Sequence, residues 1–278
     1  MRMSAFALTA ALAAFLSVPS AAAPVTFDES TGSPARQIVN VVFADYLGQR
    51  VGAVVQTATV DLDSDRTGEI VARFVHTGSC DADMKKCRTV VLRYGLHNWE
   101  ILLDRYAETV EVLEQNTRIP SRIKVDNVTW RWDSPFYAPT SEGLGEKVEL
   151  AEVPASSADA LAAAFGSGAE KLVGSGFGVK LSFARPNLAE EETLLVKLDG
   201  DTVCGSFTGC PIRVLKKNGE KWSNVLESYT RGDVTLAKTK RQGFRDIVVE
   251  TDAGFAVLGW TGNGYSVADR IEKVGGRE

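Results

Sequence analysis

The chain has 278 residues, of which 44% are hydrophobic and 24% are charged, and its formal net charge at pH 7 is −5. That composition is typical of a globular protein with one large core or two smaller ones. The acidic balance argues against nucleic acid as a partner, because phosphate groups bind to basic surfaces.

The first 22 residues predict a secretory signal peptide. Arg2 provides a positive start, residues 6–18 form an apolar run, and the small residues from Ser20 to Ala23 offer a cleavage site. The apolar run is too short for an ordinary spanning helix, and no later run reaches that length. We therefore expect an exported protein, periplasmic or secreted, with no transmembrane segment after signal removal.

Two stretches of the remaining chain, 33–122 and 159–245, align as diverged copies of one unit. Cys87 and Trp99 lie 12 residues apart, as do Cys210 and Trp222, and a tyrosine follows each tryptophan at the same spacing. Such a duplication predicts two equivalent folded modules. The predicted organisation is repeat unit 1 at 33–137, a linker rich in Pro, Ser and Gly at 138–158, and repeat unit 2 at 159–270.

Each copy begins with a predicted helix. Ser33 is an N-cap followed by proline at the first helical position, and apolar residues at helical spacing, Val41 among them, continue to Gly48. The second helix is expected from Asp159 to Gly174. A glycine-containing strand is predicted after each helix, at 51–55 and 177–181.

Beyond the helices, the apolar period falls to two, which predicts antiparallel strands. We expect Trp99, Ile101 and Leu103 to share one strand face, and Trp99 and Trp222 to anchor the two cores. The fold class is therefore α+β, two tandem copies of a helix plus a mostly β unit. The predicted strands, paired by copy, are 69–75 with 193–199, the hairpins 90–103 with 212–226, and the closing strands 128–132 with 255–260.

Four cysteines allow three disulfide pairings. An oxidising compartment favours disulfides, and the duplication favours a local bridge in each copy, Cys80–Cys87 and Cys204–Cys210. The alternative is a zinc site of four thiolates, although the cysteine spacings do not fit the usual zinc knuckles.

A run of acidic residues in the first copy suggests a metal site. Asp61, Asp63, Asp65 and Glu69 occupy alternating positions of a short loop, and Ca²⁺ takes several oxygen ligands. Arg66 stands where a glycine usually allows the sharp turn of such a loop. The alternative is that these aspartates cap backbone N–H groups of a hairpin turn. The matching stretch of the second copy, 187–190, lacks these acids.

The aspartate loop, followed by a cysteine pair and a hairpin tryptophan, resembles the loops of FG-GAP/VCBS-type modules in exported bacterial proteins. The second copy is similar to uncharacterised periplasmic proteins with a Gly-Cys…Trp pattern, through 204–211, Trp222 and 243–246. The resemblance implies Ca²⁺ held within adhesion-type domains.

Catalytic signals are sparse. The chain has two histidines, His76 and His97, and the acidic run 190–192 is typical of a solvated surface. Nucleophile-elbow, phosphate-loop and dinucleotide motifs are missing from the sequence. Enzyme activity is therefore not the favoured hypothesis.

Matched cationic residues recur in both copies: Arg118, Arg122, Arg241 and Arg245. They could grip an anionic surface, because guanidinium groups match phosphate oxygens, or pair with local acids. The leading hypothesis is a periplasmic or secreted binding or structural protein that recognises an envelope polymer, lipid or protein partner. The alternative is a cell-envelope hydrolase, or an inhibitor of one, with a site between the modules.

Overall fold

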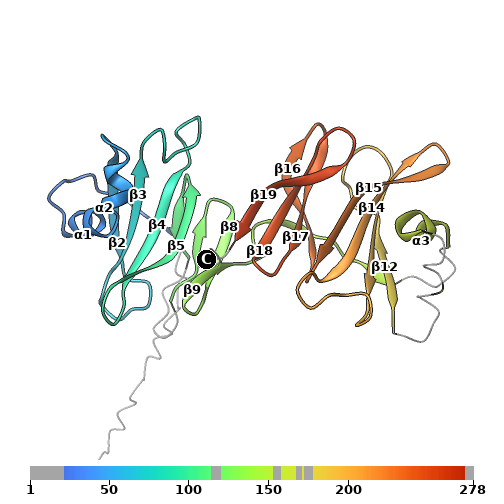
Figure 1. Cartoon of the computed structure of the whole chain (residues 1–278), viewed down its shortest axis with the longest axis horizontal. Coiled ribbons are helices and arrows are strands. Elements are labelled where there is room, and N and C mark those ends of the chain that lie inside the picture. The colour runs from blue at the N-terminus through green and yellow to red at the C-terminus, as the bar shows by residue number, and fades with distance from the viewer. Residues whose placement is uncertain (1–21, 114–119, 153–157, 167–170, 172–177, 273–278) are drawn as a thin grey trace, which may run out of the picture.

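The computed structural model describes residues 22–113, 120–152, 158–166, 171 and 178–272. Within these residues the chain is mostly β, with antiparallel strands in four sheets and three short helices. No helix in the described part of the chain is long and apolar enough to cross a membrane. The layers follow one another along the long axis of the molecule, with α1 and α2 at one end and α3 at the other (Figure 1).

The chain first forms two helices against a four-stranded meander. Ser33 caps the first helix, its Oγ accepting a hydrogen bond from the Arg36 N–H at 3.2 Å. The predicted helix is interrupted at Phe43, whose ring packs edge-on against Phe74. Val41, expected in the apolar stripe, is 78% exposed. The elements, in sheet order, are α1 (Pro34–Val42), α2 (Ala44–Gly48), β2 (Val54–Val60), β3 (Glu69–Val75), β4 (Cys87–Tyr94) and β5 (Trp99–Ala107).

The chain then crosses to a second sheet, which packs on the other face of the first. Its edge strand comes from the start of the described chain, so residues before α1 close this sheet. The strands, in sheet order, are β1 (Ala23–Pro24), β6 (Val110–Val112), β7 (Ile123–Val125), β8 (Val128–Asp133) and β9 (Phe136–Pro139).

The segment predicted as a linker contains short strands that extend both sheets of the second half. β10 (Gly145–Lys147) pairs with β16 (Val234–Arg241), and β11 (Ala151–Glu152) pairs with β12 (Lys180–Ala184). Strands of two or three residues carry no readable period, so the sequence could not show them.

The second half again has a helix, a meander and a second meander. The helix α3 (Ala158–Phe165) covers the third sheet, and the remainder of the predicted 159–174 helix lies largely outside the described residues. The third sheet continues with β12 (Lys180–Ala184), β13 (Thr193–Asp199), β14 (Cys210–Asn218) and β15 (Lys221–Thr230). The fourth contains β16 (Val234–Arg241), β17 (Phe244–Glu250), β18 (Gly254–Trp260) and β19 (Tyr265–Glu272).

Four apolar clusters fill the spaces between these layers, and one of them spans both halves. Phe255 and Ile271 of the fourth sheet belong to the same cluster as Trp130 and Tyr137 of the second sheet. The described core is therefore continuous across the middle of the molecule, rather than divided into two closed cores.

Trp99 and Trp222 are not the core anchors that the sequence suggested. Both are partly buried at the edge of helix-facing clusters, whereas Trp130 is the largest fully buried side chain. A β-bulge causes a second difference: Ile101 pairs with Leu92 and Leu103 with Val91, which leaves one extra residue in β5. Because a bulge reverses the alternation, Ile101 packs toward the helices and Leu103 toward the second sheet.

Candidate functional site

The strongest candidate site is the loop that connects β2 and β3. Asp61, Asp63 and Asp65 each offer a carboxylate oxygen, and these oxygens lie within 4.8 Å of one another. The backbone makes a left-handed turn at Ser64, with φ 60°, and at Arg66, with φ 71°. Arg66 thus adopts the conformation for which glycine is usually selected, at a cost of about 1 kcal/mol or more.

The same aspartates cap backbone N–H groups within the loop. Asp63 accepts a hydrogen bond from the Asp65 N–H, Asp61 from the Arg66 N–H and Asp65 from the Thr67 N–H, at 3.3, 3.3 and 2.6 Å. Turn capping, the alternative explanation, is therefore present. It leaves Asp61 Oδ1 buried and without a hydrogen-bond partner in the described part of the chain. A buried oxygen of this kind is costly unless a donor or a cation satisfies it.

Glu69, the fourth predicted ligand, lies just below this group but is not part of it. Its side chain is buried, and Oε2 accepts a hydrogen bond from the Leu62 N–H at 2.8 Å. Burial, with repulsion from Asp63 and Asp65, raises the pKa of Glu69 to about 7. Burial also raises the pKa of the Asp63 carboxyl. Repulsion between neighbouring carboxylates thus adds to the effect of burial at both groups.

A buried chain of hydrogen bonds connects the loop with the second sheet. The Leu62 carbonyl oxygen accepts bonds from the Ser121 N–H and Oγ, at 2.6 and 2.7 Å. The Ser121 carbonyl oxygen accepts a bond from the Tyr137 hydroxyl at 2.8 Å. Leu62, Ser121 and Tyr137 are each at most 1% exposed. The geometry of the loop is thus tied to the position of β9.

The acids of the matching loop in the second half pair with lysines of the adjacent strand β14. Glu191 pairs with Lys216 and Glu192 with Lys217, both at 2.9 Å. The Leu188 carbonyl oxygen accepts a bond from the Arg245 N–H, much as Leu62 accepts one from Ser121. Among the described residues, no lysine or arginine forms an ion pair with the three aspartates of the first loop.

Both predicted disulfides are present, Cys80–Cys87 and Cys204–Cys210. Asp199 lies close to the second bridge, but disulfide sulfurs are not the thiolates that bind a metal. The zinc alternative is therefore excluded for this oxidised form.

The predicted cationic residues do not form one cluster, and Arg118 lies outside the described residues. Arg122 donates to Glu142 at 2.7 Å in the first half. On the β16–β17 hairpin, Arg241 donates to the buried Asp246, at 3.1 and 3.2 Å. Arg245 is largely buried and donates to the carbonyl oxygens of residues 236 and 237 and to a carboxylate at residue 146. These arginines stabilise the fold locally.

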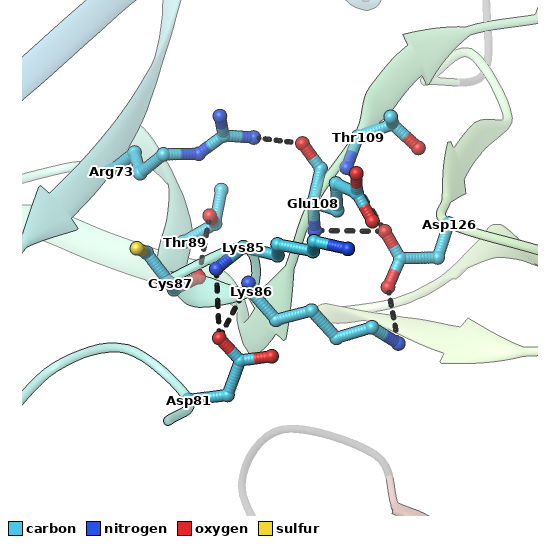
Figure 2. A network of polar contacts seen from close by, with 9 residues as sticks. All are labelled: Arg73, Asp81, Lys85, Lys86, Cys87, Thr89, Glu108, Thr109 and Asp126. Carbon is cyan, nitrogen blue, oxygen red and sulfur yellow. Dashed lines mark hydrogen bonds and ion pairs between the residues drawn. The ribbon is translucent and has the colours of Figure 1, made fainter. Parts of the chain in front are cut away.

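Sequence reasoning missed a polar network around the first disulfide loop, although Asp126 follows a strand at a turn position. The Lys86 ammonium group lies 3.0 Å from the Asp126 carboxylate, whose other oxygen accepts hydrogen bonds from the backbone N–H groups of Glu108 and Thr109 (Figure 2).

Of the two histidines, His76 accepts a hydrogen bond at Nδ1 from the Gly78 N–H, and His97 is exposed in the β4–β5 turn.

Comparison with models of protein families, with curated proteins and with solved structures finds no match.

Proposed function

We propose that this chain is an exported, non-catalytic binding protein made of two diverged copies of one unit. We also propose that the first copy holds a divalent cation, Ca²⁺, in the loop at 61–69. The observation that carries the cation site is the group of three converging aspartates together with the buried, unpartnered Asp61 Oδ1. Ca²⁺ accepts carboxylate oxygens in flexible geometry, which suits ligands from a tight loop.

The contrast between the two loops supports a cation. In the second half, Lys216 and Lys217 neutralise the loop acids from the adjacent strand. Arg93 is six residues after Cys87, as Lys216 is after Cys210. It pairs with Glu100 and lies over the Trp132 ring instead of reaching the aspartates. The second loop is thus neutralised by side chains of the protein, whereas the three aspartates of the first loop have no ion-pair partner among the described residues and would take a cation from solution.

Equivalent local features support the common origin of the two halves. Each disulfide joins a cysteine in the loop after the second strand of its meander to the first residue of the third strand. A β-bulge follows at Val91/Leu92 in one half and at Val214/Leu215 in the other. The Trp132–Tyr137 and Trp260–Tyr265 ring pairs both meet at 75°, with centroids 5.6 and 5.3 Å apart.

The cation site is tested by thermal unfolding during Ca²⁺ titration. A cation at about 100 times its Kd stabilises by about 2.7 kcal/mol, which is a Tm increase of roughly 5–10 °C for a chain of this size. The variant Asp61→Asn combined with Asp63→Asn should lose this increase, and the control Asp201→Asn, in an exposed turn, should keep it. A flat response of the unsubstituted protein would refute the site.

We further propose that the partner is a phosphate-bearing envelope polymer or lipid, bound at the β16–β17 hairpin. Lys238 and Lys240 are exposed there, and the Arg241 side chain is 49% exposed although Asp246 orients it. Lys238 and Lys240 lie two residues apart on β16, whereas Arg241 shares the contact with Asp246 made by Thr239, and neighbouring ammonium groups suit phosphate oxygens.

Co-sedimentation tests this surface. Vesicles containing phosphatidylglycerol, and separately a wall polymer with phosphodiester links, should retain the protein, whereas phosphatidylcholine vesicles should not. Lys238→Ala with Lys240→Ala should abolish retention, and the exposed control Lys221→Ala should not. Equal retention of the double variant contradicts the proposal.

A further inference from the structure

The disulfide loop of the first half, residues 80–87, reaches the place where the chain passes from the first sheet to the second. The loop joins β3 to β4, and the crossing is the short connection between β5 and β6. Inside the loop, the Asp81 carboxylate accepts the N–H groups of Lys85 and Lys86, at 2.8 and 3.1 Å. The backbone also closes on itself, because the Asp81 N–H donates to the Lys86 carbonyl oxygen at 2.8 Å. The loop therefore holds Lys86 in a defined position.

Lys86 in turn fixes the acid that organises the crossing. Its Nζ lies 3.0 Å from Asp126 Oδ2, and Asp126 Oδ1 accepts the N–H groups of Glu108 and Thr109, at 2.8 and 2.9 Å (Figure 2). Arg73 of β3 donates to the Glu108 carbonyl oxygen at 2.7 Å. Backbone groups of the crossing are thus held from both sheets.

Loss of the contact between Lys86 and Asp126 would affect buried residues directly beside it. Val110 and Val125 pair across β6 and β7 directly beside Thr109 and Asp126, and both side chains are at most 4% exposed. They belong to the cluster that spans both halves of the molecule. A loosened crossing would therefore disturb the end of the β6–β7 pair, where these two side chains are buried.

The second disulfide loop has no such charged contact. Residues 205–209 are Gly, Ser, Phe, Thr and Gly, and none carries a charge. Gly205 and Gly209 exchange two backbone hydrogen bonds, at 2.9 and 2.8 Å. A Cβ on Gly209 would lie 2.3 Å from the Thr230 carbonyl oxygen, so the backbone of this loop lies directly against Thr230. The two disulfide loops therefore differ in their contacts, because the first provides a charged side chain to the neighbouring sheet and the second does not.

We propose that the Cys80–Cys87 loop is a redox-controlled clamp on the second sheet, opened by an external dithiol oxidoreductase. Cys87 is 2% exposed and Cys80 is more accessible, so the attacking thiolate reaches the Cys80 sulfur. A mixed disulfide with Cys80 forms and the Cys87 thiolate leaves. The second thiol of the reductant then displaces Cys80, so that the protein gains two thiols and the dithiol becomes a disulfide.

The proposal does not depend on the cation site, because the clamp and the aspartate loop share no residue. Amide hydrogen exchange at Glu108 and Thr109 measures the clamp directly. Reduction of the intact protein with dithiothreitol, or the variant Cys80→Ser with Cys87→Ser, should accelerate exchange at these two amides about tenfold. Amides of Val90 and Val91 in β4 should keep their rates.

Two further variants separate a clamp from a general staple. Cys204→Ser with Cys210→Ser should leave the Glu108 and Thr109 amides unchanged. Lys86→Met, with both disulfides intact, should accelerate them about threefold, as expected for loss of a partly exposed ion pair. Unchanged exchange in the Cys80/Cys87 variant, or equal acceleration in β4, overturns the proposal.

Discussion

Arg241 tests whether the predicted cationic residues have a structural role. It donates through Nε to Asp246, whose side chain is 2% exposed, and the Thr239 hydroxyl donates to the same carboxylate at 2.7 Å. The Arg241 side chain lies against Gly259, where an added Cβ would be 2.6 Å from the Cδ and Nε atoms of Arg241. Glycine at this position therefore leaves room for the ion pair. We predict that Arg241→Met destabilises the protein even without any ligand.

The magnitude follows from the unequal exposure of the two partners. Removal of one partner of a fully buried pair costs about 3–5 kcal/mol, whereas exposed pairs contribute about 0–1 kcal/mol. Arg241 is half exposed, and Thr239 still satisfies part of the Asp246 carboxylate in the variant. We therefore expect a loss of about 2 kcal/mol in the free energy of unfolding.

Urea unfolding at neutral pH measures this loss, and a double-mutant cycle isolates the pair. Asp246→Asn keeps the hydroxyl contact but removes the charge, so the coupling with Arg241→Met should be about 1–2 kcal/mol. The corresponding decrease in Tm is roughly 4–8 °C for the single variant. A loss below about 0.5 kcal/mol, with no coupling, would show that the carboxylate is stable without the arginine.

Five further substitutions give three tests in the same unfolding assay. Gly209→Ala should lower the free energy of unfolding by at least about 2 kcal/mol, because a Cβ at φ 81° meets backbone atoms. Gly219→Ala, at φ 61° in open space, should lower it by about 1 kcal/mol. Equal losses in the two variants would contradict the close approach at Gly209. Tyr137→Phe should destabilise the protein by about 1–2 kcal/mol and Tyr265→Phe by less, since Tyr137 is fully buried and Tyr265 is not. A larger loss for Tyr265→Phe would count against the buried chain of hydrogen bonds through Tyr137. Leu62→Ala should lower the free energy of unfolding by about 3 kcal/mol and abolish any stabilisation by Ca²⁺. If Ca²⁺ still stabilised this variant, the geometry of the aspartate loop would not depend on the packing of Leu62.

Local patterns predicted much of the secondary structure. β3 and β13 have the predicted ends, the two hairpins form, and the cysteines pair within each half. These features depend on residues that are close in the sequence and on an alternating period. β2 and β12 begin a few residues after the predicted strands 51–55 and 177–181; in the first of these, Val51 is exposed and Gly52 turns at φ 86° before β2 begins.

The features that the sequence did not reveal depend on contacts between distant segments. The bulge that separates Ile101 from Leu103 could not be located from the sequence, since residues 101–103 are all apolar and do not show which of them is the extra one. Arg245 reads as a surface cation, yet it lies under carbonyl oxygens of the neighbouring strand. The alternating spacing of Asp61, Asp63 and Asp65 indicated that their carboxylates converge, but the burial of Glu69 outside that group could not be read from the sequence.

The second sheet is held on the first at two separate places, and this arrangement links the two proposed sites. Leu62 bonds Ser121 beside the aspartate loop, and Lys86 bonds Asp126 beside the disulfide loop. The same sheet contributes Trp130 to the cluster shared with the second half, and Arg105 of β5 donates to the Arg270 carbonyl oxygen of β19 at 2.9 Å.

A change at either loop therefore reaches the contact between the halves through a single layer. Loss of the proposed cation would act at the Tyr137 end of that layer, and reduction of the first bridge would act at the Val110 and Val125 end. Because packed layers shift as units rather than deform continuously, the two changes should loosen the same contact and have less than additive effects on it. Changes around α3, which packs on the far side of the third sheet, should leave that contact intact.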